Sequence, residues 1–217
     1  MDLIKFLVDL ILHLDKYLAA IIQQYGTLTY LLLFVVIFCE TGLVVTPFLP
    51  GDSLIFAAGT FAALGSLNPF VLYVLLAAAA ILGDTANYWI GYRIGARAYT
   101  GEVRFIKKEY MERTHAFFEK HGGKTILLAR FVPIVRTFAP FVAGVGEMSY
   151  GYFISYNLIG GLLWVALFLA VGYFFGNIPF VRENFSMAIL AIILISLLPA
   201  VYEVLKGRAE KKAQPST

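Results

Sequence analysis

Long apolar runs, separated by short polar breaks, dominate the pattern of this chain. Two clear runs, 26–45 and 70–92, lie in the first half, and two more, 152–176 and 183–205, lie in the second. Each holds roughly 20 residues, which at about 1.5 Å per helical residue is enough to cross the hydrocarbon core of a bilayer. The pattern therefore predicts four membrane-spanning helices.

The first 24 residues show a different pattern, with apolar residues at steps of three and four. Leucine and isoleucine recur at this spacing from Leu3 to Ile22, while Asp2 and Asp9 lie on another face. This spacing predicts an amphipathic helix over 1–24, which lies at the membrane interface or packs against the other helices. Because acidic residues interrupt the apolar ones, we do not expect a cleaved signal peptide here.

Two shorter apolar segments, 46–66 and 125–149, are interrupted by residues that break helices. These residues are Pro47, Pro50 and Gly51 in the first segment and Pro133 and Pro140 in the second. Proline removes an amide donor and disfavours a continuous helix. Interrupted backbone at membrane depth survives only where it is buried in protein or lines a wet cavity. We therefore predict that each segment forms a re-entrant helical hairpin.

Basic residues set the expected orientation. Lysine and arginine concentrate in the polar segment 93–124 and in the tail 206–217, so both are assigned to the cytoplasm. If 46–66 and 125–149 each enter and leave on one face, the N-terminal helix shares the cytoplasmic side. The first hairpin then opens outside and the second inside, as inverted repeats require. We expect a multi-pass protein with both termini in the cytoplasm.

Composition agrees with a membrane protein. With 60% hydrophobic and 14% charged residues among 217, and a mean hydropathy of +0.79, the chain is too apolar for an ordinary soluble domain. The net charge of +3 gives no reason to expect a nucleic-acid partner. The single cysteine, Cys39, excludes an intramolecular disulfide. His13, His115 and His121 lack zinc-ligand spacing, so we expect neither a metal nor a cofactor.

Four charged residues in or beside apolar segments are the candidates for chemistry. Arg130 and Arg136 lie in the second proline-broken segment. Glu40 and Asp52 lie on either side of the prolines of the first. An arginine at the centre of a membrane helix costs about 3 kcal/mol on insertion scales, so it rarely faces lipid. Two cations beside interrupted backbone therefore indicate a pocket for an anion, while the two acids would pair with these arginines or exchange protons.

Polar side chains also occur inside the predicted span 70–92. Asp84, Asn87 and Tyr88 are about one helical turn apart, so they are expected to face protein and to support the same pocket.

The two halves of the chain echo each other. Each has charged residues near a proline-broken element, then a span that ends in Gly-x3-Gly, at Gly91 and Gly95 or at Gly172 and Gly176. That spacing is typical of close helix packing. Interrupted segments in matching positions are typical of transporters built from two inverted repeats. We therefore predict an all-α integral membrane protein of two inverted repeats, each with a re-entrant hairpin and membrane-spanning helices, plus the N-terminal amphipathic helix.

Four motifs resemble those of the DedA family: ETG at 40–42, TPFLPGD at 46–52, GGK at 122–124 and ARFVPIVRT at 129–137. The resemblance implies a bacterial inner-membrane protein related to VTT-domain lipid scramblases, with two re-entrant hairpins. It also implies movement of lipid carriers, notably undecaprenyl phosphate, with dependence on proton motive force in several members.

The same resemblance implies roles for particular residues. The important acidic residues of the family fall on Glu40 and Asp52, and its important arginines fall on Arg130 and Arg136. The lipid that a member moves varies within the family, so the resemblance implies the fold more firmly than the substrate.

The preferred hypothesis is a lipid-phosphate translocase in which Arg130 and Arg136 bind the phosphate. Its partners would be an anionic membrane lipid, either a polyprenyl phosphate or a phospholipid, and protons; a homo-oligomer is compatible with the sequence. A proton-coupled transporter of ions or small solutes would use the same pocket. A static cluster of salt bridges is a third reading. An enzyme is not expected, because the pocket segments contain no histidine to serve as a general base.

Overall fold

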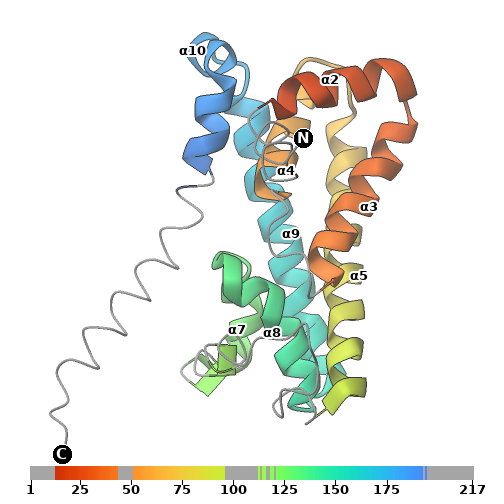
Figure 1. The fold of residues 1–217 in the computed structure, drawn as a ribbon, viewed down its shortest axis with the longest axis vertical. Helices are drawn as coiled ribbons and strands as arrows, with labels where there is room; N and C mark the ends of the chain where they lie inside the picture. The colour runs from red at the N-terminus through yellow and green to blue at the C-terminus, as the bar shows by residue number, and fades with distance from the viewer. Residues whose placement is uncertain are drawn as a thin grey trace, which may run out of the picture.

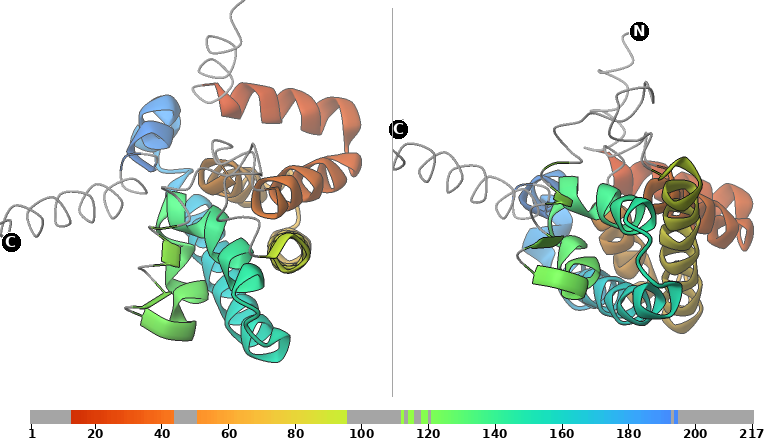
Figure 2. Two further views of the ribbon diagram at one scale, coloured as in Figure 1. Left: turned by 60° about the horizontal axis from the view of Figure 1, so that its bottom comes forward. Right: turned by 90° about the horizontal axis from the view of Figure 1, so that it is seen from below.

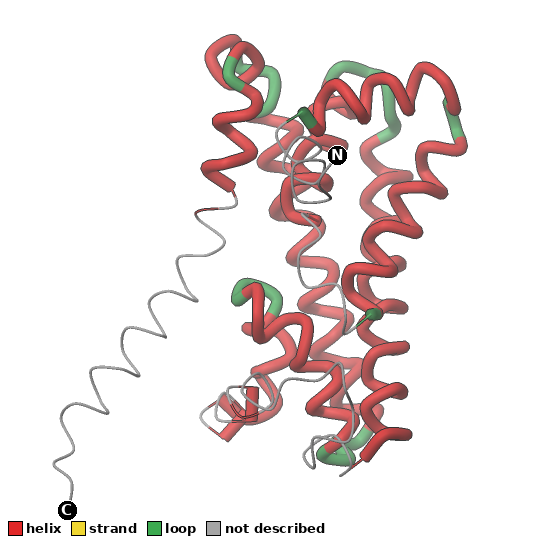
Figure 3. The backbone as a smooth tube through the Cα atoms, viewed as in Figure 1, coloured by secondary structure: helices red, strands yellow, loops and turns green. Residues whose placement is uncertain are grey.

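The computed structural model describes residues 13–43, 51–95, 112, 114–115, 118–119, 121–192 and 194. Within these residues the chain is helical, without any strand, and short loops join the helices (Figure 3). This confirms the all-α prediction. Pro47, Pro50, most of 93–124 and the tail 206–217 lie outside the described residues.

The helices of the described residues follow one another as α2 (Leu14–Tyr25), α3 (Leu28–Gly42), α4 (Gly51–Ala63), α5 (Pro69–Ile94), the 3-10 turn η2 (Gly122–Lys124), α7 (Thr125–Ala129), α8 (Pro133–Val145), α9 (Tyr150–Phe175) and α10 (Pro179–Glu183). Residues 185–192 are helical as well.

Two long helices, α5 and α9, form the frame of the molecule. Each has 26 residues and is therefore about 39 Å long. Among the described residues they are the two helices long and apolar enough to cross a membrane. They pack against each other along the longest axis of the molecule and run in opposite directions (Figure 1).

Local sequence explains where α5 begins and ends. The side chain of Asn68 accepts hydrogen bonds from the backbone N–H groups of Phe70 and Val71, at 3.0 and 3.1 Å. Gly95 follows the last residue with a φ of 56°, a conformation that favours glycine. Among the described residues, no atom lies within 4 Å of where its Cβ would be, so Gly95 ends the helix and does not pack there as the Gly-x3-Gly pattern predicts.

The short helices α4 and α8 each pack on a long helix from the other half of the chain. Helix α4 packs most extensively on α9, and α8 packs on α5. They lie toward opposite ends of the long axis (Figure 1). A Cβ at Gly91 or at Gly144 would overlap the backbone of the opposite helix in the α5–α8 pair. The packing of α4 on α9 and of α8 on α5 supports the predicted inverted repeats. The inverted repeats and the re-entrant hairpins stay predictions.

Glycines allow α4 and α9 to approach closely. A Cβ at Gly59 would overlap the carbonyl of Leu169, and a Cβ at Gly172 would overlap the carbonyl of Phe56. The hydroxyl of Thr60 donates to the carbonyl of Gly172 at 3.2 Å, which joins the two helices directly. Small residues at such a crossing are typical of membrane helices, where backbone proximity replaces the hydrophobic driving force.

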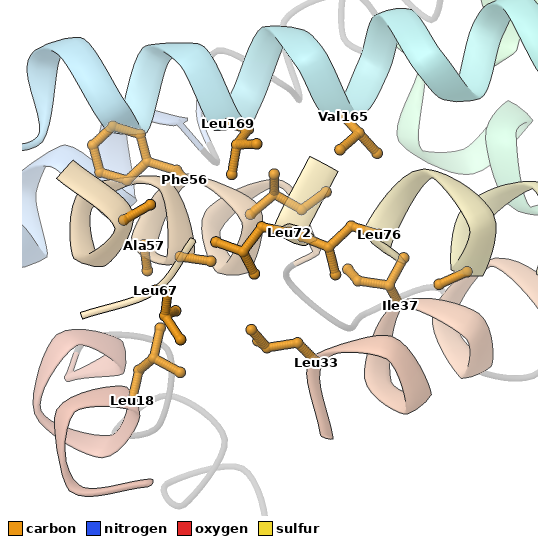
Figure 4. Close-up of a cluster of buried hydrophobic side chains, with 14 of the residues drawn as sticks. Leu18, Leu33, Ile37, Phe56, Ala57, Leu67, Leu72, Leu76, Val165 and Leu169 are labelled. Carbon is orange, nitrogen blue, oxygen red and sulfur yellow. The ribbon is translucent and has the colours of Figure 1, made fainter. Parts of the chain in front are cut away.

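Two hydrophobic cores lie along the frame, and buried polar residues lie between them. The larger core joins α2, α3, α4, α5 and α9, and includes Leu33, Phe56 and Leu72 (Figure 4). The smaller core joins the end of α5 to α7, α8 and the start of α9, and includes Tyr88 and Phe153. The buried polar residues that fall between the two are Glu40, Asp52, Asp84, Asn87, Arg130 and Asn157.

Helix α2 is the described part of the amphipathic helix predicted over 1–24. It runs across the direction of α5 and α9 at one end of the molecule (Figures 1 and 2). Leu14 and Leu18 are buried in the larger core, while Lys16 and Gln23 are exposed. Its apolar face therefore packs on protein.

The outward faces of α3, α5 and α9 carry exposed large apolar side chains. These include Leu28, Leu31 and Val35 on α3, Phe70, Val74 and Leu82 on α5, and Leu158, Leu163 and Leu167 on α9. Extended apolar surface of this kind marks contact with a membrane or a partner. It is the surface expected of helices in contact with lipid.

Candidate anion site

Arg136 stands at the centre of the site. Helix α8 begins at Pro133, after the extended backbone of Val132, so Arg136 lies near the start of this helix. Its Nη2 donates to Glu40 Oε1 at 2.6 Å, and its Nη1 donates to Asp52 Oδ1 at 2.7 Å. The side chain is 16% exposed. One guanidinium group thus joins α8 to the end of α3 and to the start of α4.

Gly51 lets Glu40 reach this position. Gly51 is the first residue of α4, and a Cβ there would overlap the Glu40 carboxylate. A larger residue would therefore displace either the carboxylate or the helix. The first turn of a helix also favours a nearby negative charge. Glu40 Oε2 is buried, and the backbone of Gly51 lies against this carboxylate.

Arg130 has a separate set of partners. It follows the last residue of α7, and its Nη2 donates to Asp84 Oδ2 on α5 and to Asn157 Oδ1 on α9, both at 2.5 Å. The side chains of Arg130 and Asp84 are 5% and 6% exposed. A Cβ at Gly160 would lie 3.1 Å from the Arg130 side chain, so this glycine makes room for the arginine against α9.

Trp164 lies beside both arginines. Its ring centroid is 5.9 Å from Arg130 Cζ and 5.5 Å from Arg136 Cζ, within the range of a cation–π interaction. Its Nε1 donates at 2.9 Å to Asp52 Oδ1, the same oxygen that accepts from Arg136. The indole therefore contacts both arginines and one of their acidic partners.

Asn87 and Tyr88 hold backbone in place around the site. Asn87 Nδ2 donates to the carbonyl of Thr41 at the end of α3, at 3.2 Å, and to that of Thr137 in α8, at 2.9 Å. The Tyr88 hydroxyl donates to the carbonyl of Met148, just before α9. Both residues are buried, as their spacing predicts. They fix α3, α8 and the α8–α9 loop against α5.

A small cavity of about 20 Å³ lies within the charged cluster. It is lined by Glu40, Thr41, Asp84, Arg130, Arg136, Thr137 and Trp164. A cavity of this volume holds roughly one water molecule. A phosphate group can therefore enter only if a carboxylate leaves its arginine or the helices separate.

The structure shows which of the predicted charges pair. The sequence grouped two acids with two arginines, whereas Glu40 and Asp52 both pair with Arg136, and Arg130 pairs with Asp84. Asp84 was expected only as a supporting residue. It is instead the direct partner of an arginine.

The prolines behave differently from one another. Pro133 begins α8, which separates it from α7. The prediction that Pro140 interrupts the segment is wrong, because Pro140 lies inside α8 and the helix continues to Val145. A proline at this position removes one backbone hydrogen bond and leaves the rest of the helix intact.

Trp164 and Asn157 are site residues that the sequence pattern does not single out. Both lie in the long apolar run that forms α9. The signal for Asn157 was a polar amide inside a predicted span, the same signal that indicated Asp84. The signal for Trp164 is weaker, because a tryptophan in a membrane helix has an apolar body and needs only one acceptor for its N–H.

Comparisons with known proteins place the chain in a family. The VTT domain matches residues 49–174, a range that includes every charged residue of the cluster except Glu40. Protein DedA of Escherichia coli (strain K12) is 55% identical over 211 residues, which cover 96% of both chains. No solved structure matches the chain.

More distant relatives carry names that place them in membranes. The uncharacterized membrane protein ML0287 of Mycobacterium leprae (strain TN) is 47% identical over 174 residues, 80% of this chain and 78% of the relative. The inner membrane protein YqjA of Escherichia coli (strain K12) is 36% identical over 172 residues, 78% of each. Together with the two membrane-length helices, these names indicate that the chain is a membrane protein.

Proposed function

Because the chain belongs to the DedA family of VTT-domain membrane proteins, we propose that it moves a phosphate-bearing lipid across the membrane. The proposed lipid is undecaprenyl phosphate or a related anionic lipid, and the proposed membrane is the bacterial inner membrane, with both termini in the cytoplasm. Protons are the proposed second ligand. The observation that carries the proposal is the fork that Arg136 makes with Glu40 and Asp52.

The fork has the geometry that a phosphate group needs. Two terminal nitrogens of one guanidinium each donate to a different carboxylate oxygen, at 2.6 and 2.7 Å. A planar guanidinium binds phosphate oxygens through the same pair of donors. The two carboxylates therefore stand where phosphate oxygens would bind, and they compete with a phosphate for the arginine.

The depth of the cluster favours transport over a surface role. Asp84 lies about 22 Å along α5 from Pro69, and Trp164 lies about 21 Å along α9 from Tyr150. Both positions are near the middle of helices about 39 Å long. A lipid head group that crosses the membrane must pass this depth, where charge is most costly without a partner.

Protons would couple to the lipid through the acids. The described cluster holds three carboxylates, on Glu40, Asp52 and Asp84, and two guanidinium groups. An unbalanced charge is costly where water is scarce, so uptake of a proton would neutralise the cluster. A protonated carboxylate holds Arg136 less tightly, which would free the guanidinium for phosphate.

Transport of an ion or a small solute remains the alternative, because it would use the same pocket. A purely structural salt-bridge cluster is less well supported, since apolar packing usually stabilises a protein as well as a buried ion pair does.

Flipping of a fluorescent polyprenyl phosphate in proteoliposomes, with and without a pH gradient, tests the proposal. We expect Arg136→Ala to lower the rate to that of protein-free liposomes. Arg136→Lys should remain impaired, because lysine keeps the charge and loses the fork. Arg93→Ala, at an exposed arginine in the last turn of α5, is the matched control and should flip at the parental rate. Parental flipping by Arg136→Ala, or ion flux without lipid flipping, would contradict the proposal.

A further inference from the structure

Two N–H donors converge on a single oxygen of Asp52. Arg136 Nη1 lies 2.7 Å from Asp52 Oδ1, and Trp164 Nε1 lies 2.9 Å from the same atom. One donor is charged and comes from α8, and the other is neutral and comes from α9. A buried tryptophan needs one acceptor, but nothing in packing requires it to share that acceptor with an arginine.

We propose that Trp164 is a phosphate-binding residue, whose indole N–H and Arg136 Nη1 together form the site for one phosphate oxygen. Asp52 Oδ1 occupies this position in the structure. When the Asp52 side chain moves away, both N–H groups lose their acceptor. A phosphate oxygen, which is also an anionic acceptor, can then bind to both of them. This inference rests on the proposed function and adds a residue that the charged motifs do not include.

The surroundings of the indole suit this role. Trp164 is 2% exposed, so water competes little for its N–H. Its ring centroid also lies 5.9 Å from Arg130 Cζ and 5.5 Å from Arg136 Cζ, so the aromatic face interacts with both cations of the site. The indole N–H is a donor only and does not titrate, so it stays able to donate to an anionic acceptor.

The first test observes the native Trp164 directly. The chain has two tryptophans, so Trp89→Phe leaves Trp164 as the single indole. Trp89 lies away from the charged cluster, beside Tyr88, Tyr92 and Tyr150, and is 42% exposed. The full chain, labelled with 15N-tryptophan in detergent micelles, is titrated with geranylgeranyl phosphate. We expect a saturable shift of the Nε1–H resonance, and no shift with geranylgeraniol, which lacks the phosphate.

Inorganic phosphate forms the third arm of this titration. A shift only at concentrations far above those of the lipid supports a lipid head group as the ligand. An equal response to inorganic phosphate would keep Trp164 as a phosphate ligand and overturn the lipid part of the proposed function. An unmoved resonance, while the lipid binds by an independent assay, would overturn the role of Trp164 alone.

The second test removes the donor and keeps the aromatic ring. Trp164→Phe should weaken binding of geranylgeranyl phosphate about tenfold, because one hydrogen bond to a charged group is lost. Trp89→Phe should bind with parental affinity. Unchanged affinity in Trp164→Phe would contradict the inference while Arg136→Ala still loses binding. Absence of binding by the parental chain would overturn the proposed function, and this inference with it.

Discussion

Arg130 is paired with Asp84, with 2.5 Å between Nη2 and Oδ2 and with both side chains almost completely buried. Removing one member of such a pair leaves an uncompensated buried charge and costs about 3–5 kcal/mol. Replacing both members by apolar residues is often neutral or stabilising. A single and a double variant of this pair therefore distinguish a structural role from a role in transport. The double variant can restore stability, but it cannot restore a transport step that needs the charges.

Asp84→Asn should therefore lower the free energy of unfolding by about 3 kcal/mol, because Arg130 keeps its charge and loses its counter-ion. The double variant Arg130→Met with Asp84→Leu should recover most of that stability and still fail to flip lipid. Thermal unfolding in detergent and lipid flipping in proteoliposomes measure the two effects. Parental flipping by the double variant would show that this pair is structural only.

The contacts of Glu40 and Asp52 with Arg136 predict that lipid binding depends on pH. Protonation of Glu40 weakens its hold on the guanidinium, so the affinity for a phosphate lipid should rise as the pH falls. The rise should end near pH 6, where a phosphate monoester takes up its own proton (pKa about 6). The measurement is affinity for geranylgeranyl phosphate between pH 5 and pH 9.

Asp52→Asn should imitate the protonated acid, so that binding persists, its pH dependence weakens and gradient-driven transport is lost. Glu40→Gln is measured in parallel, since both acids contact the same guanidinium. If the pH profiles of both variants match the parental profile, neither carboxylate is the proton-linked group.

Gly51→Ala should disturb the site without changing any charge. Its methyl group would overlap the Glu40 carboxylate, so either the carboxylate or the start of α4 must move. We expect a loss of about 1–3 kcal/mol in the free energy of unfolding and slower flipping. Gly151→Ala is the matched control, because no atom of the described residues lies within 4 Å of its Cβ position in the first turn of α9. That control should be neutral or slightly stabilising; equal behaviour of the two variants would refute the close fit at Gly51.

Labelling of introduced cysteines tests the inverted arrangement. Ser66 and Ser149 are exposed and come shortly before the first residues of α5 and α9. These two helices begin at opposite ends of the molecule (Figures 1 and 3). In a Cys39→Ser background, we expect an impermeant reagent to label Ser66→Cys from the outside and Ser149→Cys from the cytoplasm. Labelling of both from the same face would rule out inverted hairpins.

The sequence predicted the membrane character and the charged residues because both are local properties. Apolar runs of about 20 residues, and charges inside apolar segments, are visible without knowledge of the fold. The partner of Arg130, in contrast, depends on contacts between segments that are distant along the chain. Asp84 is 46 residues away along the chain, and only the packing of α7 between α8 and α9 decides which acid this arginine meets.

The helix that contains Pro140 illustrates a second limit of sequence patterns. A proline predicts a break, but α8 remains helical through Pro140. Close packing of α5 against α8, with glycines where the two helices cross, supports it. Trp164 shows the same limit in another form. Its one polar group is the indole N–H, and the acceptor of this N–H is Asp52, which lies 112 residues earlier in the chain.

The bond between Thr60 and Gly172 has a consequence for how the protein is made. Its two residues are 112 positions apart, so α4 leaves the ribosome long before α9 exists. At about 5–20 residues per second, the delay is roughly 6 to 22 s. During that interval the glycine face of α4, with Asp52 at its start, must wait at the insertion machinery without the helix that covers it. A ribosome that paused between the two segments would prolong this exposure, so slow codons in this region should lower the yield of inserted protein.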